Sequence, residues 1–373
     1  MSIHTDRLIA AAARHDRDAI TALLDCEEQA VTAALATHAF AVMESTVGAN
    51  VYYRGLLEFS NVCVLDCYYC GIRAQDTAVS RYTLSEEEIM EAAHATAALG
   101  YGSMTLQSGE RSDAEFVGFV TRVLQRIKRE TVSDALPEGL GITLCVGEQD
   151  PAAYRAFFDA GAHRYLLRIE TSHPELFARI HPPRQRFDTR LQALRSLKRI
   201  GYQVGTGVMI GIPGQTHEQL ADDILFFVNE EIDMIGMGPY VPHSQTPMGR
   251  GITDSREEKR RRLNLSLRMI ALTRIASPWV NIAAATALQA IDPFGREKAL
   301  RAGANVLMPI VTPTENRGDY VLYDNKPCTD EDRTECAGCL GSRVASTERS
   351  VATDEWGDPP HYAKRMAGAG GFA

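Results

Sequence analysis

Residues 58–71 read Glu58-Phe59-Ser60-Asn61-Val62-Cys63-Val64-Leu65-Asp66-Cys67-Tyr68-Tyr69-Cys70-Gly71. The three cysteines of this stretch are separated by three residues and then by two. Three thiolates on one short loop can bind three of the four irons of a cubane iron–sulfur cluster. The fourth iron then has no protein ligand and can chelate a small molecule. The spacing of Cys63, Cys67 and Cys70 therefore predicts a reactive [4Fe-4S] cluster.

Structural zinc is the alternative for this loop, because a C-x2-C pair is common in zinc sites. A structural zinc site needs four ligands, usually from a second C-x2-C or an H-x3-H pair. The sequence offers neither pair near Cys70. We therefore favour the iron–sulfur interpretation.

The whole chain has 373 residues and a net charge of −9. This length suits one barrel-sized domain with extensions. The acidic net charge argues against a nucleic-acid partner, because proteins that bind nucleic acids present basic surfaces. No run of about 18 apolar residues indicates a membrane span, and Met1–Arg7 lacks the basic-then-apolar order of a signal peptide. Clustered cysteines in an unexported protein favour metal over disulfides. We therefore expect a cytoplasmic protein, and the exposed cluster implies anaerobic life.

Short apolar segments alternate with amphipathic segments from about residue 51 onward. The expected strands are Gly55–Asn61, Ser103–Gln107, Gly141–Val146, Arg164–Glu170, Val204–Ile210, Met234–Gly238, Asn281–Ala285 and Asn305–Pro309. Helices fill the intervals, and several are expected to end at a glycine shortly before a strand. Eight such units predict an α/β fold, a complete (β/α)8 barrel of the TIM type. A partial barrel of six units is the alternative.

The expected domain division places the barrel at residues 51–310. Residues 1–50 are Ala-rich with helical apolar spacing and predict an N-terminal helical extension. Residues 311–373 form a C-terminal segment whose cysteine-containing loop carries Cys328, Cys336 and Cys339. Their x7 and x2 spacing differs from that of the first loop, and a cysteine cluster in an Asp-rich loop predicts a metal. A further iron–sulfur cluster, zinc or an unfilled remnant are the possible states.

Charged residues follow several expected strands, and barrel active sites lie at those strand ends. Glu110 follows the second strand in Gln107-Ser108-Gly109-Glu110. Arg168 and Glu170 share one face at the end of the fourth strand, where either a ligand or a mutual ion pair would satisfy them. Arg190 opens the next helix and has the geometry to clamp a carboxylate.

The Cys63-x3-Cys67-x2-Cys70 motif, with aromatic Tyr69 before its last cysteine, resembles that of the radical S-adenosylmethionine (SAM) enzymes. The resemblance implies that SAM chelates the open iron and is cleaved reductively to a 5'-deoxyadenosyl radical. It also implies a set of SAM contacts in this chain. These are Tyr69, Ser108, Glu110 to the amino group, Glu170 to the ribose, Arg168 and Arg190 near the carboxylate, and Met209 and Ile210 against adenine.

Longer segments between Arg54 and Cys339 resemble the HydE-type maturases of [FeFe]-hydrogenase. The matching segments are Leu57–Cys63, Leu106–Glu110, Arg164–Thr171, Gly211–Thr216, Gly303–Pro309 and the second cysteine group. The resemblance implies processing of an organometallic iron and cysteine precursor during H-cluster assembly. It implies other hydrogenase maturases and an electron donor such as ferredoxin or flavodoxin as partners. It also implies a substrate cavity inside the barrel, lined by Arg54, Thr143, Cys145, Thr286 and Tyr320.

Two other functions remain open at this point. A methylornithine synthase-like amino-acid mutase would share the barrel and the first cysteine motif, and the second cysteine group favours the maturase over it. A non-catalytic metal or iron–sulfur carrier would leave Glu110, Glu170 and Arg190 without a purpose. The chain departs from the maturase pattern at Cys145, where relatives can carry serine, and at His181-Pro182-Pro183-Arg184.

Overall fold

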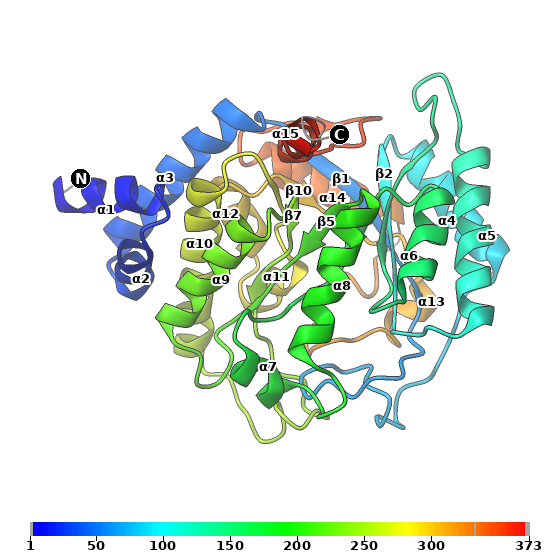
Figure 1. The fold of residues 1–373 in the computed structure, drawn as a ribbon, viewed down its shortest axis with the longest axis horizontal. Coiled ribbons are helices and arrows are strands. Elements are labelled where there is room, and N and C mark those ends of the chain that lie inside the picture. Colours follow the sequence, from blue (N-terminus) through cyan, green and yellow to red (C-terminus); the bar gives the residue numbers. More distant parts are fainter. Residues whose placement is uncertain (1–2, 332, 370–373) are drawn as a thin grey trace.

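A computed structural model describes residues 3–331 and 333–369 of the chain (Figure 1). Three helices, α1 (Ile3–Ala12), α2 (Arg17–Asp25) and α3 (Gln29–Thr46), precede the first strand. They lie to one side of the sheet, where α3 packs along α10 (Arg256–Ala276) and α2 packs on α9 (His217–Asn229). The N-terminal helical extension expected from the sequence is therefore present. Within the described ranges, no helix is both long and apolar enough to cross a membrane.

Eight parallel strands form one curved sheet in the order β10-β1-β2-β3-β4-β5-β7-β9. Their bounds are β1 Val51–Ser60, β2 Ser103–Ser108, β3 Gly141–Cys145, β4 Arg164–Leu166, β5 Gln203–Thr206, β7 Met234–Ile235, β9 Asn281–Ile282 and β10 Val306–Leu307. Two further short strands, β6 (Met209–Ile210) and β8 (Gly238–Pro239), pair with each other, and β11 (Val351–Ala352) pairs with β1. The α/β class is confirmed, and the continuous strand order contains eight parallel strands rather than the six of the alternative, with β11 added beside β1.

Helices connect successive strands and cover the outside of the sheet (Figure 1). Their bounds are α4 Glu86–Ala98, α5 Ala114–Glu130, α6 Pro151–Asp159, α7 Pro174–Ile180, α8 Phe187–Ile200, α9 His217–Asn229, α10 Arg256–Ala276, α11 Thr286–Ile291, α12 Gly295–Arg301, α13 Thr314–Arg317, α14 Arg333–Ala345 and α15 Pro360–Ala369. Local sequence explains the ends of several. Ser85 and Glu88 form the capping box of α4, and Asp150 caps α6 with Pro151 in its first turn. Gly201 ends α8 in the left-handed conformation, with φ of 111°.

The strands are close to those expected, with two differences that matter for the site. The fourth strand stops at Leu166, so Arg168 and Glu170 lie just beyond it. The expected fifth strand is divided into β5 and β6, because Gly207 and Val208 leave the main sheet between them. Both differences occur at the carboxyl end of the sheet, where the backbone turns outward to form loops.

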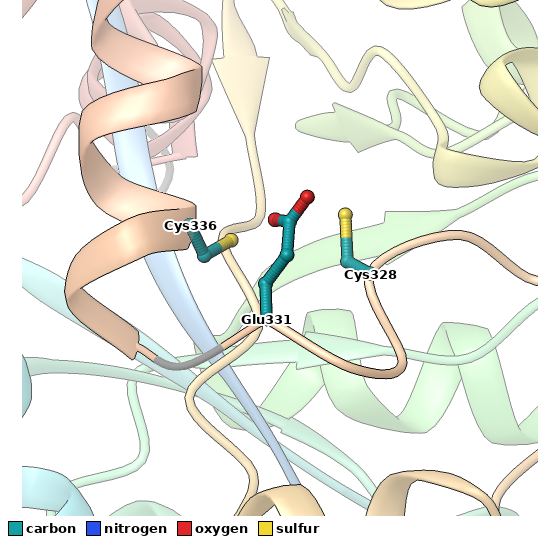
Figure 2. A group of neighbouring side chains, drawn as sticks. All are labelled: Cys328, Glu331 and Cys336. Atoms are coloured by element: carbon teal, nitrogen blue, oxygen red, sulfur yellow. The ribbon is translucent and has the colours of Figure 1, made fainter.

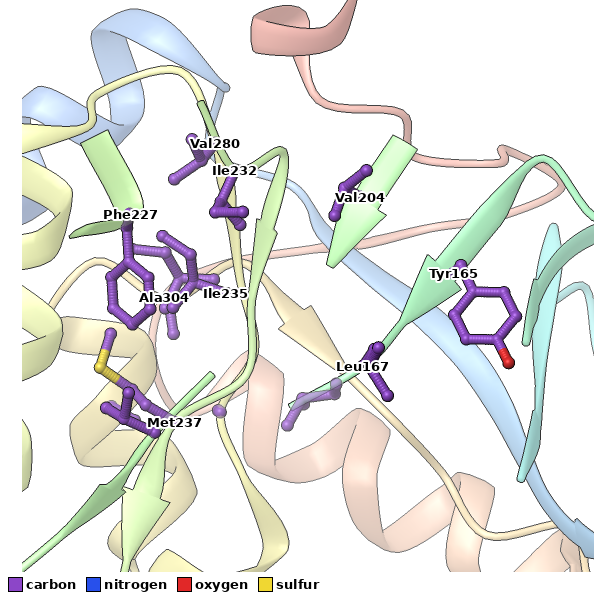
Figure 3. Close-up of a cluster of buried hydrophobic side chains, with 14 of the residues drawn as sticks. Tyr165, Leu167, Val204, Phe227, Ile232, Ile235, Met237, Val280 and Ala304 are labelled. Atoms are coloured by element: carbon purple, nitrogen blue, oxygen red, sulfur yellow. The ribbon is translucent and has the colours of Figure 1, made fainter. Parts of the chain in front are cut away.

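One face of the sheet is apolar and packs against the helices. The strand residues Leu57, Leu106, Leu144, Tyr165 and Val204 belong to one buried cluster with helix residues Ile89, Val120, Phe157 and Leu194. Figure 3 shows part of this cluster, including Tyr165, Val204, Phe227, Ile235 and Met237. Burying each such aliphatic side chain contributes about 1.5–3 kcal/mol. This packing favours one register for each strand, because a shift by one residue would turn the alternate, polar residues toward the apolar helices.

The strands at the two ends of this order, β10 and β9, also contact each other through their flanking residues. Ala283 and Val306 form a parallel bridge. The amide of Asn305 donates to the Ile282 carbonyl at 2.9 Å, and the amide of Ala284 donates to the Val306 carbonyl at 2.9 Å. The two ends of the eight-strand order therefore contact each other.

The last part of the chain, from β11 to α15, covers the end of the sheet opposite the cysteine loop (Figure 1). Arg164 donates to the Trp356 carbonyl at 2.7 Å, and Arg54 donates to the Gly357 carbonyl at 3.3 Å. The Trp356 indole donates in turn to the Gly139 carbonyl at 2.9 Å. These contacts close the amino end of the sheet and leave the carboxyl end for chemistry.

Candidate active site

The loop that carries Cys63, Cys67 and Cys70 begins directly after β1, at the carboxyl end of the sheet. The backbone amides of Leu65 and Glu110 both donate to the Cys63 sulfur at 3.4 Å. Gly109 allows this approach, because a Cβ there would lie 2.4 Å from the Val62 carbonyl oxygen. The turn after β2 is therefore packed against the cysteine loop.

The three thiols of this loop do not ionise readily unless a cation lies beside them. Burial raises the pKa of the Cys67 thiol to about 12, and burial also raises the pKa values of the Cys63 and Cys70 thiols. A bound metal cation supplies the charge that stabilises such thiolates. Three soft donors with amide N–H groups aimed at sulfur match an iron–sulfur cluster, whose sulfurs accept hydrogen bonds. The residues of this loop therefore fit the cofactor predicted from their spacing.

Glu110 leaves the same turn and is largely buried. One carboxylate oxygen accepts from the backbone amide of Glu148 at 2.8 Å. Burial raises the pKa of Glu110 to about 7. A cationic ligand group beside this carboxylate would favour its charged form. The preceding Ser108 hydroxyl donates to the Gly109 carbonyl at 2.7 Å and so shapes the turn.

Arg168 and Glu170 form the mutual ion pair that the sequence left open. The guanidinium donates to both carboxylate oxygens at 2.9 Å, the planar two-point geometry that suits arginine. Arg168 also donates to the carbonyls of Gly236 and Val208. Glu170 adopts a φ of 64°, which turns the chain from β4 toward β6. The two side chains neutralise each other in this structure. Their position also places the Glu170 carboxylate at the carboxyl end of the sheet.

Arg190 sits in the first turn of α8, and its side chain points back toward the strand ends. It donates to the Glu148 carboxylate and to the Arg168 carbonyl. Sequence reasoning missed Glu148 as the partner of Arg190. The signal was available, because Gly147-Glu148 after β3 repeats the Gly109-Glu110 pattern after β2. Glu110, Glu148 and Arg190 thus form one charged group beside the cysteine loop.

The remaining cofactor candidates divide between two environments. Met209 belongs to a small apolar cluster with Leu176 and Tyr240, against which Tyr69 packs. Ile210 is fully buried in the main core instead, because neighbouring residues of a strand face opposite sides. The structure therefore brings Tyr69 and Met209 together and leaves Ile210 apart from them.

The face of the sheet opposite the helices is polar and buried. Arg54 pairs with Ser103 across β1 and β2, and Thr105 pairs with Thr143 across β2 and β3. Arg54 Nε and the three hydroxyls are buried without a hydrogen-bond partner among the described residues. Unpaired buried polar groups cost free energy unless water or a ligand satisfies them. This face therefore provides hydrogen-bonding groups for a polar ligand.

The other predicted cavity residues lie nearer the strand ends. Cys145 pairs with Gln107, whose amide donates to the Tyr320 hydroxyl at 3.3 Å. Tyr320 is 1% exposed. Thr286 is the first residue of α11, directly after the segment that follows β9. Cys145 and Tyr320 are therefore brought close to one another through Gln107, which sequence reasoning did not select.

A buried ion pair joins the C-terminal segment to the first strand. Lys326 Nζ lies 2.7 Å from both carboxylate oxygens of Glu58 and donates to the Tyr320 carbonyl at 2.7 Å. The two charged side chains are only 6% and 2% exposed. Sequence reasoning missed this pair, since its members lie 268 positions apart. Lys326 therefore fixes the loop that presents Tyr320.

The second cysteine group is only partly assembled as predicted. Ligand atoms of Cys328, Glu331 and Cys336 lie within 4.8 Å of one another, and Figure 2 shows the carboxylate between the two sulfurs. Cys336 lies on the buried face of α14, whereas Cys339 is exposed on the same helix and accepts from Arg343 at 3.4 Å. A hydrogen bond from the Cys336 thiol lowers the pKa of the Cys328 thiol. The donors that converge are therefore two sulfurs and a carboxylate.

Comparisons with known proteins define the class to which this fold and cysteine loop belong. Residues 57–227 match the family model described as "Radical SAM superfamily". The chain is similar to the methylornithine synthase PylB in its crystal structure, with a TM-score of 0.77 at 23% identity, covering 96% of this chain and 99% of that one. It is similar to the maturase HydG from Carboxydothermus hydrogenoformans, with a TM-score of 0.72 at 17% identity over 92% of this chain and 78% of that one.

Sequence similarity narrows the class. The "[FeFe] hydrogenase maturase subunit HydE" of Thermotoga maritima is 38% identical over 342 residues, covering 91% of this chain and 93% of that protein. The "3-methylornithine synthase" of Methanosarcina acetivorans is 28% identical over 85% of each chain. The chain therefore belongs to the HydE family of [FeFe]-hydrogenase maturases within the radical SAM superfamily. This membership implies a [4Fe-4S] cluster and SAM as cofactors.

Proposed function

We propose that this chain binds a [4Fe-4S] cluster at Cys63, Cys67 and Cys70 and processes an organometallic iron and cysteine precursor during [FeFe]-hydrogenase maturation. The observation that carries the proposal is the packing of the cysteine loop against the Gly109-Glu110 turn, through the Glu110 amide and the Cys63 sulfur. When bound, the cluster and SAM supply a 5'-deoxyadenosyl radical for the reaction.

The residues of this chain bind and orient SAM in the proposal. Glu110 accepts hydrogen bonds from the amino group, and loss of its proton accompanies binding because its pKa is raised to about 7 by burial. Glu170 accepts from the ribose while Arg168 holds its orientation at 2.9 Å. Arg190, fixed by Glu148, faces the SAM carboxylate. The cluster of Met209 and Tyr69 contributes an apolar surface for the adenine ring.

A closed barrel completes the proposal for the substrate side. The hydrogen bonds between the segments around β9 and β10 support a complete (β/α)8 barrel spanning residues 51–310. The polar face of the sheet then surrounds the barrel axis, and the unpartnered atoms of Arg54 and Thr143 point to a polar or anionic substrate. The part of that space nearest the carboxyl ends of the strands is lined by Cys145, Tyr320 and Thr286. An enclosed site excludes water from the radical.

The remaining parts of the proposal concern partners and place. A low-potential carrier such as ferredoxin or flavodoxin supplies the electron, and other hydrogenase maturases supply the precursor and receive the product. The cytoplasm is the compartment in which these partners meet. Residues 1–50 and 311–373 flank the catalytic barrel.

Hydrogen evolution by an apo-[FeFe]-hydrogenase tests the function. The hydrogenase is matured anaerobically with the partner maturases, with this protein added or omitted. We expect activity that requires this protein and all three cysteines of the first loop. If the chain cleaves SAM and holds its cluster but activates no hydrogenase, the function moves to an amino-acid mutase of the methylornithine synthase type.

The second cysteine group supports a separate metal. We propose that this metal is bound by Cys328, Glu331 and Cys336, as a further iron–sulfur cluster or a zinc ion. Cys339 lies outside this group of ligands and belongs to the same cysteine motif. Replacing Cys336 with alanine is expected to lower the metal content at this group and leave SAM cleavage within about twofold of normal, because the first loop keeps all its ligands. Metal analysis and the yield of 5'-deoxyadenosine measure both effects.

The matched control is Cys339→Ala, which removes an exposed thiol from the same helix. We expect it to retain more metal than Cys336→Ala. Loss of SAM cleavage in a folded Cys336→Ala protein with its first cluster intact would contradict the separation of the two groups.

A further inference from the structure

A short segment between α7 and α8 lies along the cysteine loop and contacts it repeatedly. The Tyr68 amide donates to the Ile180 carbonyl at 3.0 Å. The Tyr69 hydroxyl lies 3.2 Å from His181 Nε2, with the two rings packed edge to face. We call residues 180–185 the covering segment. The first half of this segment therefore holds Tyr68 and Tyr69 of the cysteine loop in place.

The second half of the covering segment reaches the cysteine loop closer to its metal-binding sulfurs. Arg184 donates to the Val64 carbonyl and lies 3.8 Å from the Asp66 carboxylate. The neighbouring Gln185 places its side-chain Oε1 3.4 Å from the sulfur of Cys67. The contacts with residues 64, 66, 67, 68 and 69 mean that the side chain of Gln185 is held against Cys67 by its neighbours.

The amide of Gln185 is only half used in this arrangement. Its Oε1 accepts from the Cys67 thiol, while its Nε2 is buried without a hydrogen-bond partner in the part of the chain that the structure describes. A buried N–H group without a partner loses its hydrogen bond to water on folding and gains none in return. The arrangement therefore suits a protonated thiol and leaves the donor end of the amide without a role.

Metal binding reverses the requirement at the sulfur. A thiolate ligand carries no proton, so Cys67 can accept a hydrogen bond but cannot donate one. A half-turn of the Gln185 amide exchanges Oε1 and Nε2. Because Nε2 has no partner to lose among the described residues, this rotation breaks no hydrogen bond except the one the thiol itself gives up. The exchanged amide would then donate to the sulfur.

We propose that Gln185 is a positioning residue that donates a hydrogen bond to the Cys67 thiolate and raises the reduction potential of the cluster. The inference rests on the proposed cluster at Cys63, Cys67 and Cys70 and deepens it. A hydrogen bond to a ligating sulfur stabilises the more negative, reduced state of the cluster. Cys63 receives its donors from the backbone amides of Leu65 and Glu110. Gln185 supplies the corresponding donor at Cys67 from a side chain, which a substitution can remove.

A potentiometric titration of the reconstituted full-length protein, followed by electron paramagnetic resonance of the reduced cluster, tests the role. We expect Gln185→Leu to lower the equilibrium constant for reduction about tenfold, which is a shift of about 59 mV to more negative potential for one electron. Gln185→Glu, with nearly the same shape, is expected to shift the potential further in the same direction, because it removes the N–H donor and adds a negative charge beside the sulfur. The matched control is Gln75→Leu, since Gln75 is an exposed glutamine of the same loop region that pairs with Arg73 at 3.1 Å.

The iron and sulfide contents of each variant distinguish an effect of Gln185 on the reduction potential from a structural role in holding the loop. Full cluster loading with a negative shift in both Gln185 variants and no shift in Gln75→Leu supports the proposal. An unchanged potential in a fully loaded Gln185→Leu protein overturns it. If Gln185→Leu fails to hold the cluster, Gln185→Met, a neutral side chain of similar length without an N–H donor, decides by the same titration, and loss of iron from both of these variants would assign a structural role instead. A wild-type protein that binds no cluster at all would refute the proposed function itself.

Discussion

Alanine at Cys63, Cys67 or Cys70 is expected to reduce SAM cleavage to the level of a reaction without protein. Each substitution removes one of three thiolates, and two ligands from one loop do not retain a cluster whose fourth iron has no protein ligand. The measurement is 5'-deoxyadenosine formed after reduction with dithionite, together with the iron content of each reconstituted variant. Dithionite avoids dependence on a protein electron donor.

Cys26→Ala is the matched control for these variants. Cys26 is a free cysteine at the end of α2, far in the sequence from the loop, and its carbonyl accepts from Arg268 at 2.6 Å. The backbone interaction does not depend on the thiol, so we expect normal cleavage and normal iron. Retained cleavage in any of the three loop variants would refute their assignment as cluster ligands.

Local patterns in the sequence were enough to place much of the candidate site. The cysteine loop and the Gly109-Glu110 turn each depend on a few adjacent residues at a strand end, and the eight strands could be placed from short apolar runs. Arg168 and Glu170 were expected on one face of the fourth strand. The strand ends at Leu166, and the two side chains nevertheless form an ion pair just beyond it. These features are local, because each depends on residues within a few positions of one another in the sequence.

Contacts between distant segments could not be predicted in the same way. Arg190 was selected without its partner Glu148, and Lys326 and Gln185 were not selected at all. Each of these side chains acts across the space between two elements whose packing only the folded chain defines. Residues 181–184 of the covering segment depart from the family pattern, yet the contact between Gln185 and Cys67 depends on how the segment between α7 and α8 packs on the cysteine loop.

The second cysteine group illustrates a different limit. Spacing alone grouped Cys328, Cys336 and Cys339, but α14 places Cys336 and Cys339 in different environments, one buried and one exposed. Glu331 reaches the two sulfurs instead, from the turn before the helix. A spacing rule counts residues, whereas ligand geometry depends on which face of a helix each residue occupies.

Lys326→Met is expected to destabilise the protein by about 3–5 kcal/mol, because it leaves the buried carboxylate of Glu58 without its cation. Glu58 is 2% exposed at its side chain, and burial raises its pKa while Lys326 lowers it. The midpoint of urea unfolding, followed by circular dichroism, measures the loss. The double variant Glu58→Leu with Lys326→Met should recover most of it, because an apolar pair of similar size carries no charge to desolvate.

The pH dependence of the loss distinguishes an unpaired charge from lost packing. In Lys326→Met the pKa of Glu58 should rise further, so the folded variant keeps its proton to a higher pH than the unfolded chain does. Stability is then lost as the pH rises through that interval, and the deficit relative to the wild type should be smaller at low pH than at high pH. Lys298→Met is the control, since Lys298 pairs with Asp292 at 2.8 Å but is 42% exposed, and such pairs contribute about 0–1 kcal/mol. A Lys326→Met protein no less stable than Lys298→Met at high pH would show that Glu58 does not carry a buried charge, and that the loop presenting Tyr320 is held by its other contacts.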